Sequence, residues 1–310
     1  MIYHCICESN DGLAYNHPVF AFLQSFHMPL FIFLSGLLAK NAPLNKMIFF
    51  YCLYKKYRQL LMPFLVIGLA LTLSNGKEPI TLLTSNMKSG YWFLLTLFEC
   101  FLLHYVGLVI FSNLKKNNLI FDISWSIVVL FLLYVFNSNF GSSIIAIILG
   151  LFHLYKYYPY FLVASLLNKY DLHRKVLGSE ILFTIAFIAL AVSIIMLGSN
   201  VRIRGFSFLL NLSYLYLCVS TMYRIENLSN TVLSVLSYLG RNSIYIYVFH
   251  YFFIIHTSLS FIQPSPNNTS LVLDIVMISA PTLLIICFSL SIGWMIKECT
   301  MLHKLIFGRK

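Results

Sequence analysis

The stretch Phe26-His27-Met28-Pro29-Leu30-Phe31-Ile32-Phe33-Leu34-Ser35-Gly36 decides the fold class of this chain. It is apolar apart from its histidine, up to the Ser35-Gly36 pair with which it ends. Pro29 is expected in the first turn of a helix, where the missing N–H of proline leaves no hydrogen bond unmade. Ser35 and Gly36 follow deeper in the helix, where small residues let a second helix approach closely. The stretch therefore predicts a helix that packs tightly against another.

The composition of the whole chain extends this prediction to a membrane protein. Of the 310 residues, 59% are hydrophobic and only 10% are charged, and the mean hydropathy is +0.83. Charged residues make up about a quarter of a soluble domain. The apolar residues also form blocks of roughly 17–25 residues, the length at which a helix crosses a bilayer. We therefore predict an all-α, polytopic integral membrane helix bundle.

The net charge of +11 does not indicate a nucleic-acid partner, because the basic residues lie between the apolar blocks and form no single patch. The seven cysteines include no CxxC pair, and Cys5-Ile6-Cys7 has no second ligand pair nearby. This pattern predicts buried free thiols and no metal site. The lipid bilayer is the partner that the composition itself predicts.

Five motifs in the same order resemble those of the acyltransferase 3 family, the membrane-bound sugar O-acetylases and fucose 4-O-acetylase-like acyltransferases. The opening stretch is similar to the family's "fhMPlFfflSG" signature. Four further matches follow along nearly the whole chain, at Arg58-Gln59-Leu60-Leu61-Met62-Pro63, Tyr91-Trp92-Phe93-Leu94-Leu95, Tyr157-Tyr158-Pro159-Tyr160-Phe161 and Leu239-Gly240-Arg241-Asn242-Ser243-Ile244-Tyr245-Ile246-Tyr247-Val248-Phe249-His250. The resemblance implies a single acyltransferase 3-like transmembrane domain over residues 1–310.

The apolar blocks predict about nine full spans after an N-terminal stub that ends at Ile2-Tyr3-His4. The spans are expected at Val19–Ala39, Leu60–Ser74, Tyr91–Phe111, Leu119–Phe136, Ser142–Leu167, Ser179–Leu197, Phe206–Tyr223, Asn242–Leu259 and Leu271–Ile296. The block from Ser142 is overlong and contains Lys156 and Pro159, so we expect a kink or a tilt there. The stub is far shorter than the ~20 residues of a span, so we expect most of a first helix to be missing from this form.

The distribution of basic residues predicts the orientation of the chain. With alternating loops, sixteen of the 21 lysines and arginines fall on one side and four on the other, with Lys156 inside a span. The positive-inside rule makes the richer side cytoplasmic. We therefore expect a multi-pass arrangement with a cytoplasmic C-terminus, and the resemblance implies the inner (cytoplasmic) membrane of a bacterial cell as its location.

The resemblance implies that His4 is the catalytic histidine. An imidazole suits a general base that takes the proton of a sugar hydroxyl while the oxygen attacks a thioester carbon. It also suits a nucleophile that carries the acyl group briefly. His27 and Ser35 belong to the signature helix that would shape the site, and an interhelical hydrogen bond accounts for His27 equally well.

The remaining candidates for binding the substrate or the acyl donor lie on later helices. Arg58 and Arg241 are expected to hold phosphates of the donor, although positive-inside anchoring explains each of them too. Asn242 and Ser243 are suited to cap the helix that follows Arg241. Ionisable residues inside spans are functional candidates by default, and this adds Glu99, His104 and His250. Trp92, an aromatic residue at the end of a span, is a further candidate.

The sequence thus predicts an O-acyltransferase that moves an acyl group, most simply acetyl, from acyl-CoA to a sugar hydroxyl. The acceptor implied by the resemblance is a cell-surface polysaccharide or its lipid-linked precursor. Acyl-CoA is expected as a co-substrate, with no bound cofactor. Two alternatives remain open: a glycolipid or polysaccharide transporter or flippase, whose cavity would also carry Glu99, His104 and His250, and an inactive truncated member of the family.

Overall fold

The computed structural model describes residues 18–41, 45–110, 119–198, 206–225, 230–256 and 271–308, and within them it contains helices and no strand. The chain divides into two compact units. The first unit comprises Met1–Gln24, Lys55–Leu94 and Ser234–Lys310, and the second comprises Ser25–Tyr54 and Leu95–Leu233. The all-helical prediction is confirmed for the described residues.

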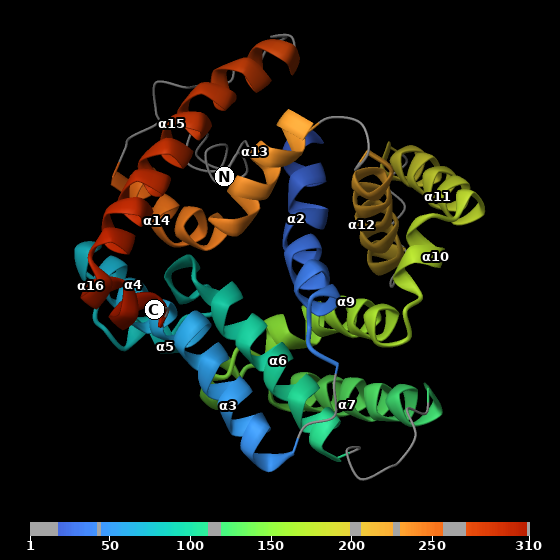
Figure 1. Ribbon diagram of the computed structural model, residues 1–310, viewed down its shortest axis with the longest axis horizontal. Coiled ribbons are helices and arrows are strands. Elements are labelled where there is room, and N and C mark those ends of the chain that lie inside the picture. The colour runs from blue at the N-terminus through green and yellow to red at the C-terminus, as the bar shows by residue number, and fades with distance from the viewer. Residues whose placement is uncertain are drawn as a thin grey trace. The chain divides into compact units, whose positions relative to one another are not determined.

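Figure 1 shows the helices along the chain. Their bounds are α2 (Pro18–Leu37), α3 (Lys46–Lys56), the π-helical turn η2 (Tyr57–Leu61), α4 (Met62–Ser74), α5 (Thr81–Thr84), the 3-10 turn η3 (Lys88–Gly90), α6 (Trp92–Ile110), α7 (Leu119–Phe140), α8 (Ile144–Ile148), α9 (Leu151–Lys169), α10 (His173–Leu177), α11 (Glu180–Gly198), α12 (Phe206–Ile225), α13 (Asn230–Arg241), α14 (Ser243–His256), α15 (Leu271–Glu298) and α16 (Thr300–Phe307).

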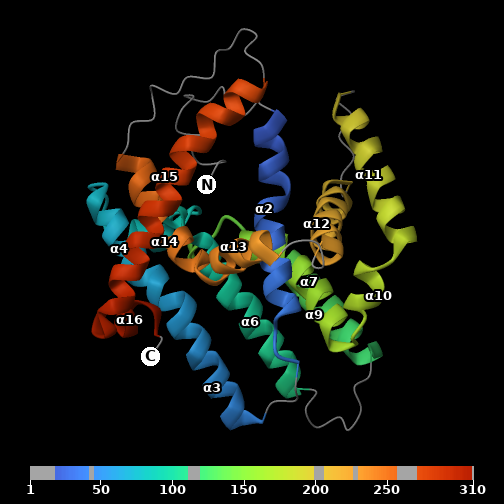
Figure 2. The ribbon, with the colours of Figure 1, turned by 45° about the horizontal axis from the view of Figure 1, so that its top comes forward.

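The first unit is built around the pairing of α14 with α15, which lie side by side in Figures 1 and 2. Gly293 of α15 makes this approach possible, because a Cβ there would lie 2.7 Å from the Tyr245 side chain of α14. The short helix α16 packs against α4 and η2. The segment that follows α15 therefore folds back onto the same unit.

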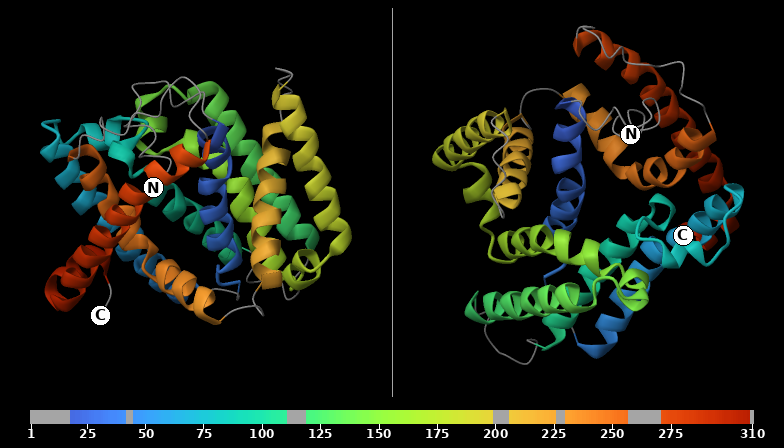
Figure 3. Two further views of the ribbon diagram at one scale, coloured as in Figure 1. Left: turned by 90° about the horizontal axis from the view of Figure 1, so that it is seen from above. Right: turned by 180° about the vertical axis from the view of Figure 1, so that it is seen from behind.

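The second unit contains two antiparallel helix pairs, α7 with α9 and α11 with α12. The pair α11 and α12 is seen most clearly in the left view of Figure 3. The signature helix α2 meets α9 at Gly36, where a Cβ would lie 2.5 Å from the Phe161 carbonyl oxygen and 2.9 Å from Ala164 Cβ. The close helix approach predicted at Gly36 is confirmed.

The structure differs from two details of the predicted helices. Pro29 lies in the middle of α2, because this helix begins eleven residues earlier at Pro18. The overlong block from Ser142 is broken at Gly150, which has the left-handed φ of 64°, and α9 then runs on through Pro159. Glycine adopts a left-handed conformation without the steric cost that other residues meet. The break therefore falls at the glycine and not at the proline.

The helix expected from Leu60 is also longer than predicted. Helical structure runs from Lys46 to Ser74 through the π-helical turn η2, in which the Met62 N–H bonds the Tyr57 carbonyl five residues back. Pro63 follows at once and has no N–H to donate. A wider turn just before this proline lets the helix continue.

Four described helical segments are long and apolar enough to cross a bilayer: Lys46–Ser74, Trp92–Ile110, Leu119–Phe140 and Pro281–Glu298. Shorter apolar segments occur at His27–Leu37, Glu180–Val192 and Ser243–Phe253. These helices agree with a membrane protein. The count of nine full spans stays a prediction, as does the single domain over residues 1–310.

We expect Gly36→Val to lower the thermal stability of the purified protein, because the new side chain would meet the backbone of α9. Overpacking of this kind costs about 1–3 kcal/mol. Gly240→Ala is the matched control, since no atom lies within 4 Å of a Cβ there. The measurement is the melting temperature in detergent, and equal melting temperatures for the two variants would contradict the tight α2–α9 contact.

Candidate functional site

A basic hollow lies in the first unit. It has a volume of about 840 Å³, and side chains from α13, α14, α15 and α16 line it together with the turn at Asn242. Arg241 and Lys297 supply two positive charges, while Tyr245 and His303 supply an aromatic and a polar wall. Its remaining lining residues are Ser234, Tyr238, Gly240 and Asn242.

The chain turn between α13 and α14 places Arg241 at the hollow. Arg241 is the last residue of α13, and its guanidinium donates to the Ser237 hydroxyl at 2.9 Å. The Asn242 amide donates back to the Tyr238 carbonyl at 2.9 Å. The Asn242 side chain therefore hydrogen-bonds the end of α13. The sequence suggested that it would cap the start of the next helix instead. Ser243 begins α14 and is half-buried.

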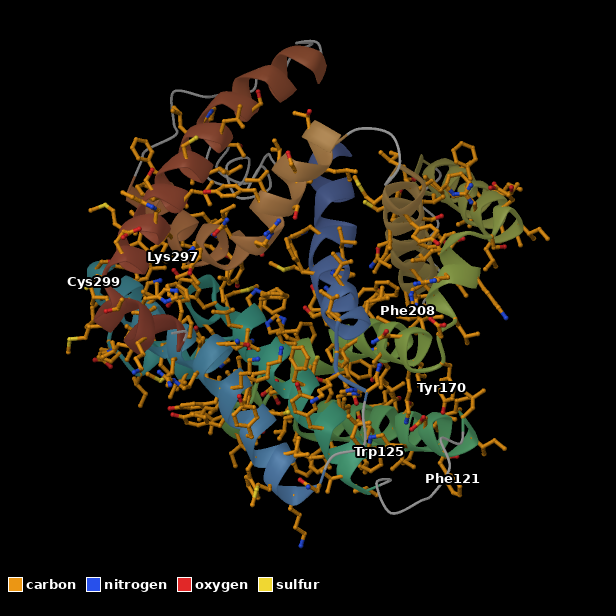
Figure 4. The ribbon with its side chains drawn as sticks, in the orientation of Figure 1. Phe121, Trp125, Tyr170, Phe208, Lys297 and Cys299 are labelled. Atoms are coloured by element: carbon orange, nitrogen blue, oxygen red, sulfur yellow. The ribbon has the colours of Figure 1, made fainter. Side chains whose placement is uncertain are left out.

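A second helix end supplies the other cation. Lys297 lies in the last turn of α15 (Figure 4). The chain then bends at Cys299, which has an extended backbone conformation (ψ 90°) and directly precedes α16. Cations near helix C-termini are stabilised by the partial negative charge of the terminal carbonyls. Within the described ranges neither Arg241 nor Lys297 forms an ion pair with a carboxylate. Two positive charges are therefore left facing one hollow.

A buried hydrogen bond holds the wall of the hollow together. The Tyr245 hydroxyl lies 2.7 Å from His303 Nε2, and both side chains are buried. The Phe307 ring packs edge-on against Tyr245. This bond joins α14 to α16, so the position of α16 is set by the same residue pair that lines the hollow.

Arg58 contacts α16 and does not line the hollow. Its Nη2 donates to the Lys304 carbonyl at 2.8 Å, and its side chain lies against Gly308, whose φ is 63°. Arginine is suited to this role because its planar head donates several directed hydrogen bonds. The structure thus gives Arg58 a positioning contact, beside the donor-binding role expected from the sequence.

His250 and Trp92 lie in an aromatic cluster of the first unit. His250 is 3% exposed, and its Nδ1 faces the carbonyl oxygens of Tyr247 at 2.6 Å and Ile246 at 3.1 Å. Trp92 is also buried and packs edge-on against the adjacent Phe93 ring. Neither residue lines the basic hollow.

The turn before α6 contains a buried lysine, Lys88, which is one of the four basic residues that the charge count assigns to the side with fewer of them. The Lys88 side chain is fully buried, and its ammonium donates to the Leu83 carbonyl at 2.9 Å. Lys88, Ser89 and Gly90 all have positive φ values. The charge counted for topology is therefore enclosed by the fold.

The remaining described candidates belong to the second unit. His27 on α2 and Glu99 on α6 are half-buried. The Ser35 hydroxyl donates to the Phe31 carbonyl of its own helix at 2.8 Å. His104 Nε2 lies 3.2 Å from the Lys40 carbonyl oxygen, which ties α6 to the chain just after α2. His4 lies outside the described residues.

Sequence reasoning missed Tyr245, Lys297 and His303 as site residues. Lys297 entered only as a topological charge, and His303 follows the last predicted span by several residues. A signal was present in the C-terminal segment, since His303 and Lys304 interrupt an otherwise apolar stretch. Nothing in the spacing, however, indicated that this segment returns to α14.

The described helices define the class of the protein as a helical membrane protein with a basic hollow at the ends of helices α13 and α15. The family model described as "Acyltransferase domain" matches residues 1–296, so the chain belongs to the acyltransferase 3 family of membrane acyltransferases. No curated protein and no solved structure matches the chain. Arg241, Asn242 and Tyr245 lie inside the matched region, and Lys297 and His303 lie just beyond it.

We expect Arg58→Gln to loosen α16, because a glutamine amide reaches less far than a guanidinium toward the Lys304 carbonyl. Hydrogen–deuterium exchange should become faster in the peptide covering Thr300–Phe307. Arg174→Gln is the matched control, since Arg174 is exposed on α10 of the second unit. Unchanged exchange in α16 of the Arg58 variant would contradict its positioning role.

Proposed function

We propose that this acyltransferase moves an acyl group, most simply acetyl, from acyl-CoA to a hydroxyl of a cell-surface polysaccharide or its lipid-linked precursor. The observation that carries the proposal is the basic hollow bounded by Arg241 and Lys297. Coenzyme A carries a diphosphate and a ribose phosphate, and these groups need positive charge and hydrogen-bond donors. The hollow offers both in a space of the size that ligand pockets occupy.

The predicted topology supports this use of the hollow. Arg241 and Lys297 both lie on the side that carries most of the lysines and arginines, which the positive-inside rule makes cytoplasmic. Acyl-CoA is a cytoplasmic metabolite, so its phosphates would meet the hollow from that side. The proposed location is the inner membrane, with a cytoplasmic C-terminus.

The reaction itself is assigned to His4 by resemblance to the family. In the proposed step the acceptor hydroxyl oxygen attacks the thioester carbonyl while the imidazole takes the hydroxyl proton. The C–S bond then breaks, and the proton passes to the leaving thiolate, which departs as CoA–SH. The products are an O-acyl ester and free coenzyme A, and no redox partner or metal is required by this balance.

We expect Arg241→Gln and Lys297→Gln to weaken acetyl-CoA binding. Removing one charged hydrogen bond costs about 1.5–3 kcal/mol, which corresponds to a loss of affinity of about tenfold to hundredfold. The measurement is isothermal titration calorimetry with the full chain in nanodiscs. Lys175→Gln, an exposed lysine of α10 in the second unit, is the control and should bind as the unsubstituted protein does.

If both variants bind acetyl-CoA with the affinity of the unsubstituted protein, the donor site does not lie at the hollow. A comparison of coenzyme A with its 3′-dephospho form then sharpens the assignment. If Arg241 or Lys297 binds the ribose phosphate, the variant that lacks this cation should bind coenzyme A and its 3′-dephospho form equally well. The variant that keeps the cation should still bind coenzyme A more tightly.

We expect deletion of the gene to remove an O-acyl signal from the proton NMR spectrum of the host's surface polysaccharide. Re-expression should restore this signal, whereas His4→Ala should not, because the acceptor hydroxyl would have no base. The amount of protein in the membrane is the control and should be unchanged. An unaltered acyl pattern with less polysaccharide at the surface would indicate a transporter instead.

A further inference from the structure

One face of the helix α13 lines the basic hollow. Ser234, Tyr238 and Arg241 all belong to its wall. They are four and three residues apart along α13, a spacing that puts side chains on one face of a helix. Val235 and Leu236 fall outside this row, and both are exposed without lining the hollow. The face of α13 that meets the hollow therefore combines a hydroxyl, an aromatic ring and a cation.

Tyr238 and Tyr245 both line the hollow, but their rings differ in how much surface they present. Tyr245 is only 4% exposed, its hydroxyl is bonded to His303, and the Phe307 ring packs edge-on against it. Tyr238 is 57% exposed. Its main-chain carbonyl accepts the hydrogen bond from the Asn242 amide, and this bond does not involve the ring. The Tyr238 ring therefore has surface on which a flat ligand group can stack.

The cation nearest to this ring along the chain is Arg241. Its guanidinium donates to the Ser237 hydroxyl at 2.9 Å, and this bond uses one of the five N–H donors of the group. Tyr238 and Arg241 are three residues apart, so their backbone positions differ by about 4.5 Å along the helix axis. Lys297 contributes a second cation to the hollow from the last turn of α15. The hollow thus offers one open aromatic ring together with two cations.

This combination of groups matches one end of the coenzyme A molecule. Phosphate oxygens bind guanidinium and ammonium groups. A nucleobase stacks on an aromatic side chain, because every base has a π-face. The adenine base and the phosphates of coenzyme A are attached to the same ribose, so a site for both must place a ring and cations close together. The pantetheine arm has no aromatic ring, and the match is therefore to the adenosine end.

We propose that Tyr238 is the residue on which the adenine ring of the acyl-CoA donor stacks, while Arg241 and Lys297 bind the donor's phosphates. This inference rests on the proposed function, because it takes acyl-CoA as the ligand of the hollow. It adds the orientation of the bound donor, whose adenosine end lies against α13 and whose thioester lies at the opposite end of the molecule. Tyr238 contributes to binding and takes no part in the transfer of the acyl group.

The test is isothermal titration calorimetry of the full chain in lipid nanodiscs with coenzyme A. Tyr238→Leu removes the π-face and keeps an apolar side chain, so the affinity should fall about fivefold to hundredfold, as expected for the loss of one base stack. Tyr238→Phe keeps the ring and should bind as the unsubstituted protein does. Tyr51→Leu is the matched control, since Tyr51 is 68% exposed on α3 and does not line the hollow. A loss of affinity in Tyr238→Leu no larger than in Tyr51→Leu would overturn the assignment.

A second ligand separates the loss of stacking from a general weakening of the site. 4′-Phosphopantetheine keeps the arm and one phosphate of coenzyme A but lacks the adenine, its ribose and the 3′-phosphate. Tyr238→Leu should bind this ligand with the affinity of the unsubstituted protein, which also shows that the variant is folded. An equal loss of affinity for both ligands would contradict the role of Tyr238 in adenine stacking.

The cation variants show whether the inference or the proposed function has failed. If Arg241→Gln and Lys297→Gln weaken the binding of coenzyme A and Tyr238→Leu does not, the hollow remains the donor site and the adenine assignment is wrong. If all three variants bind coenzyme A with full affinity, the hollow is not the donor site, and the adenine assignment fails with it.

Discussion

The constraint on which the rest of the structure depends is that hydrocarbon offers no hydrogen-bond partner to a polar group. Helices satisfy the backbone groups, because their N–H and C=O groups form hydrogen bonds within one segment. Hydroxyl side chains meet it in the same way. Ser35 donates to the carbonyl of Phe31, and Ser291 donates to that of Cys287, each four residues back. Polar residues can therefore occur inside apolar helices without partners on other helices.

Charged side chains cannot be satisfied so locally, and two ion pairs between described helices lie where those helices end. Asp122 at the start of α7 pairs with Lys169 at the end of α9, and Arg224 at the end of α12 pairs with Glu180 at the start of α11. Each of these pairs joins two helices that pack along their length. Arg241 and Lys297 differ, because within the described ranges they face a hollow and no carboxylate. This contrast separates charges that hold helices together from the two charges that line the hollow.

The positions of the long helices could be predicted from sequence because apolar length alone fixes them. The bounds of α6 and α11 differ from the predicted spans by one residue at each end. Local breaks were less predictable, since the break at Gly150 depends on one dihedral angle that composition does not reveal. The amphipathic helix α13 was missed because a search for apolar blocks passes over a helix with a polar face.

The candidate site could be predicted only in part, because a single cation at a helix end can have several different roles. Arg241 was found because it belongs to a motif, but Lys297 lies 56 residues further along the chain and was explained by topology alone. Both sit at helix C-termini, where a cation satisfies the helix dipole and the positive-inside rule together. A sequence cannot distinguish these two roles from phosphate binding, because all three favour the same residue at the same place. Only the packing of α14 against α15, with α16 held by the Tyr245–His303 bond, brings the two cations to one hollow. Their convergence is a tertiary property, and it carries the functional proposal for this reason.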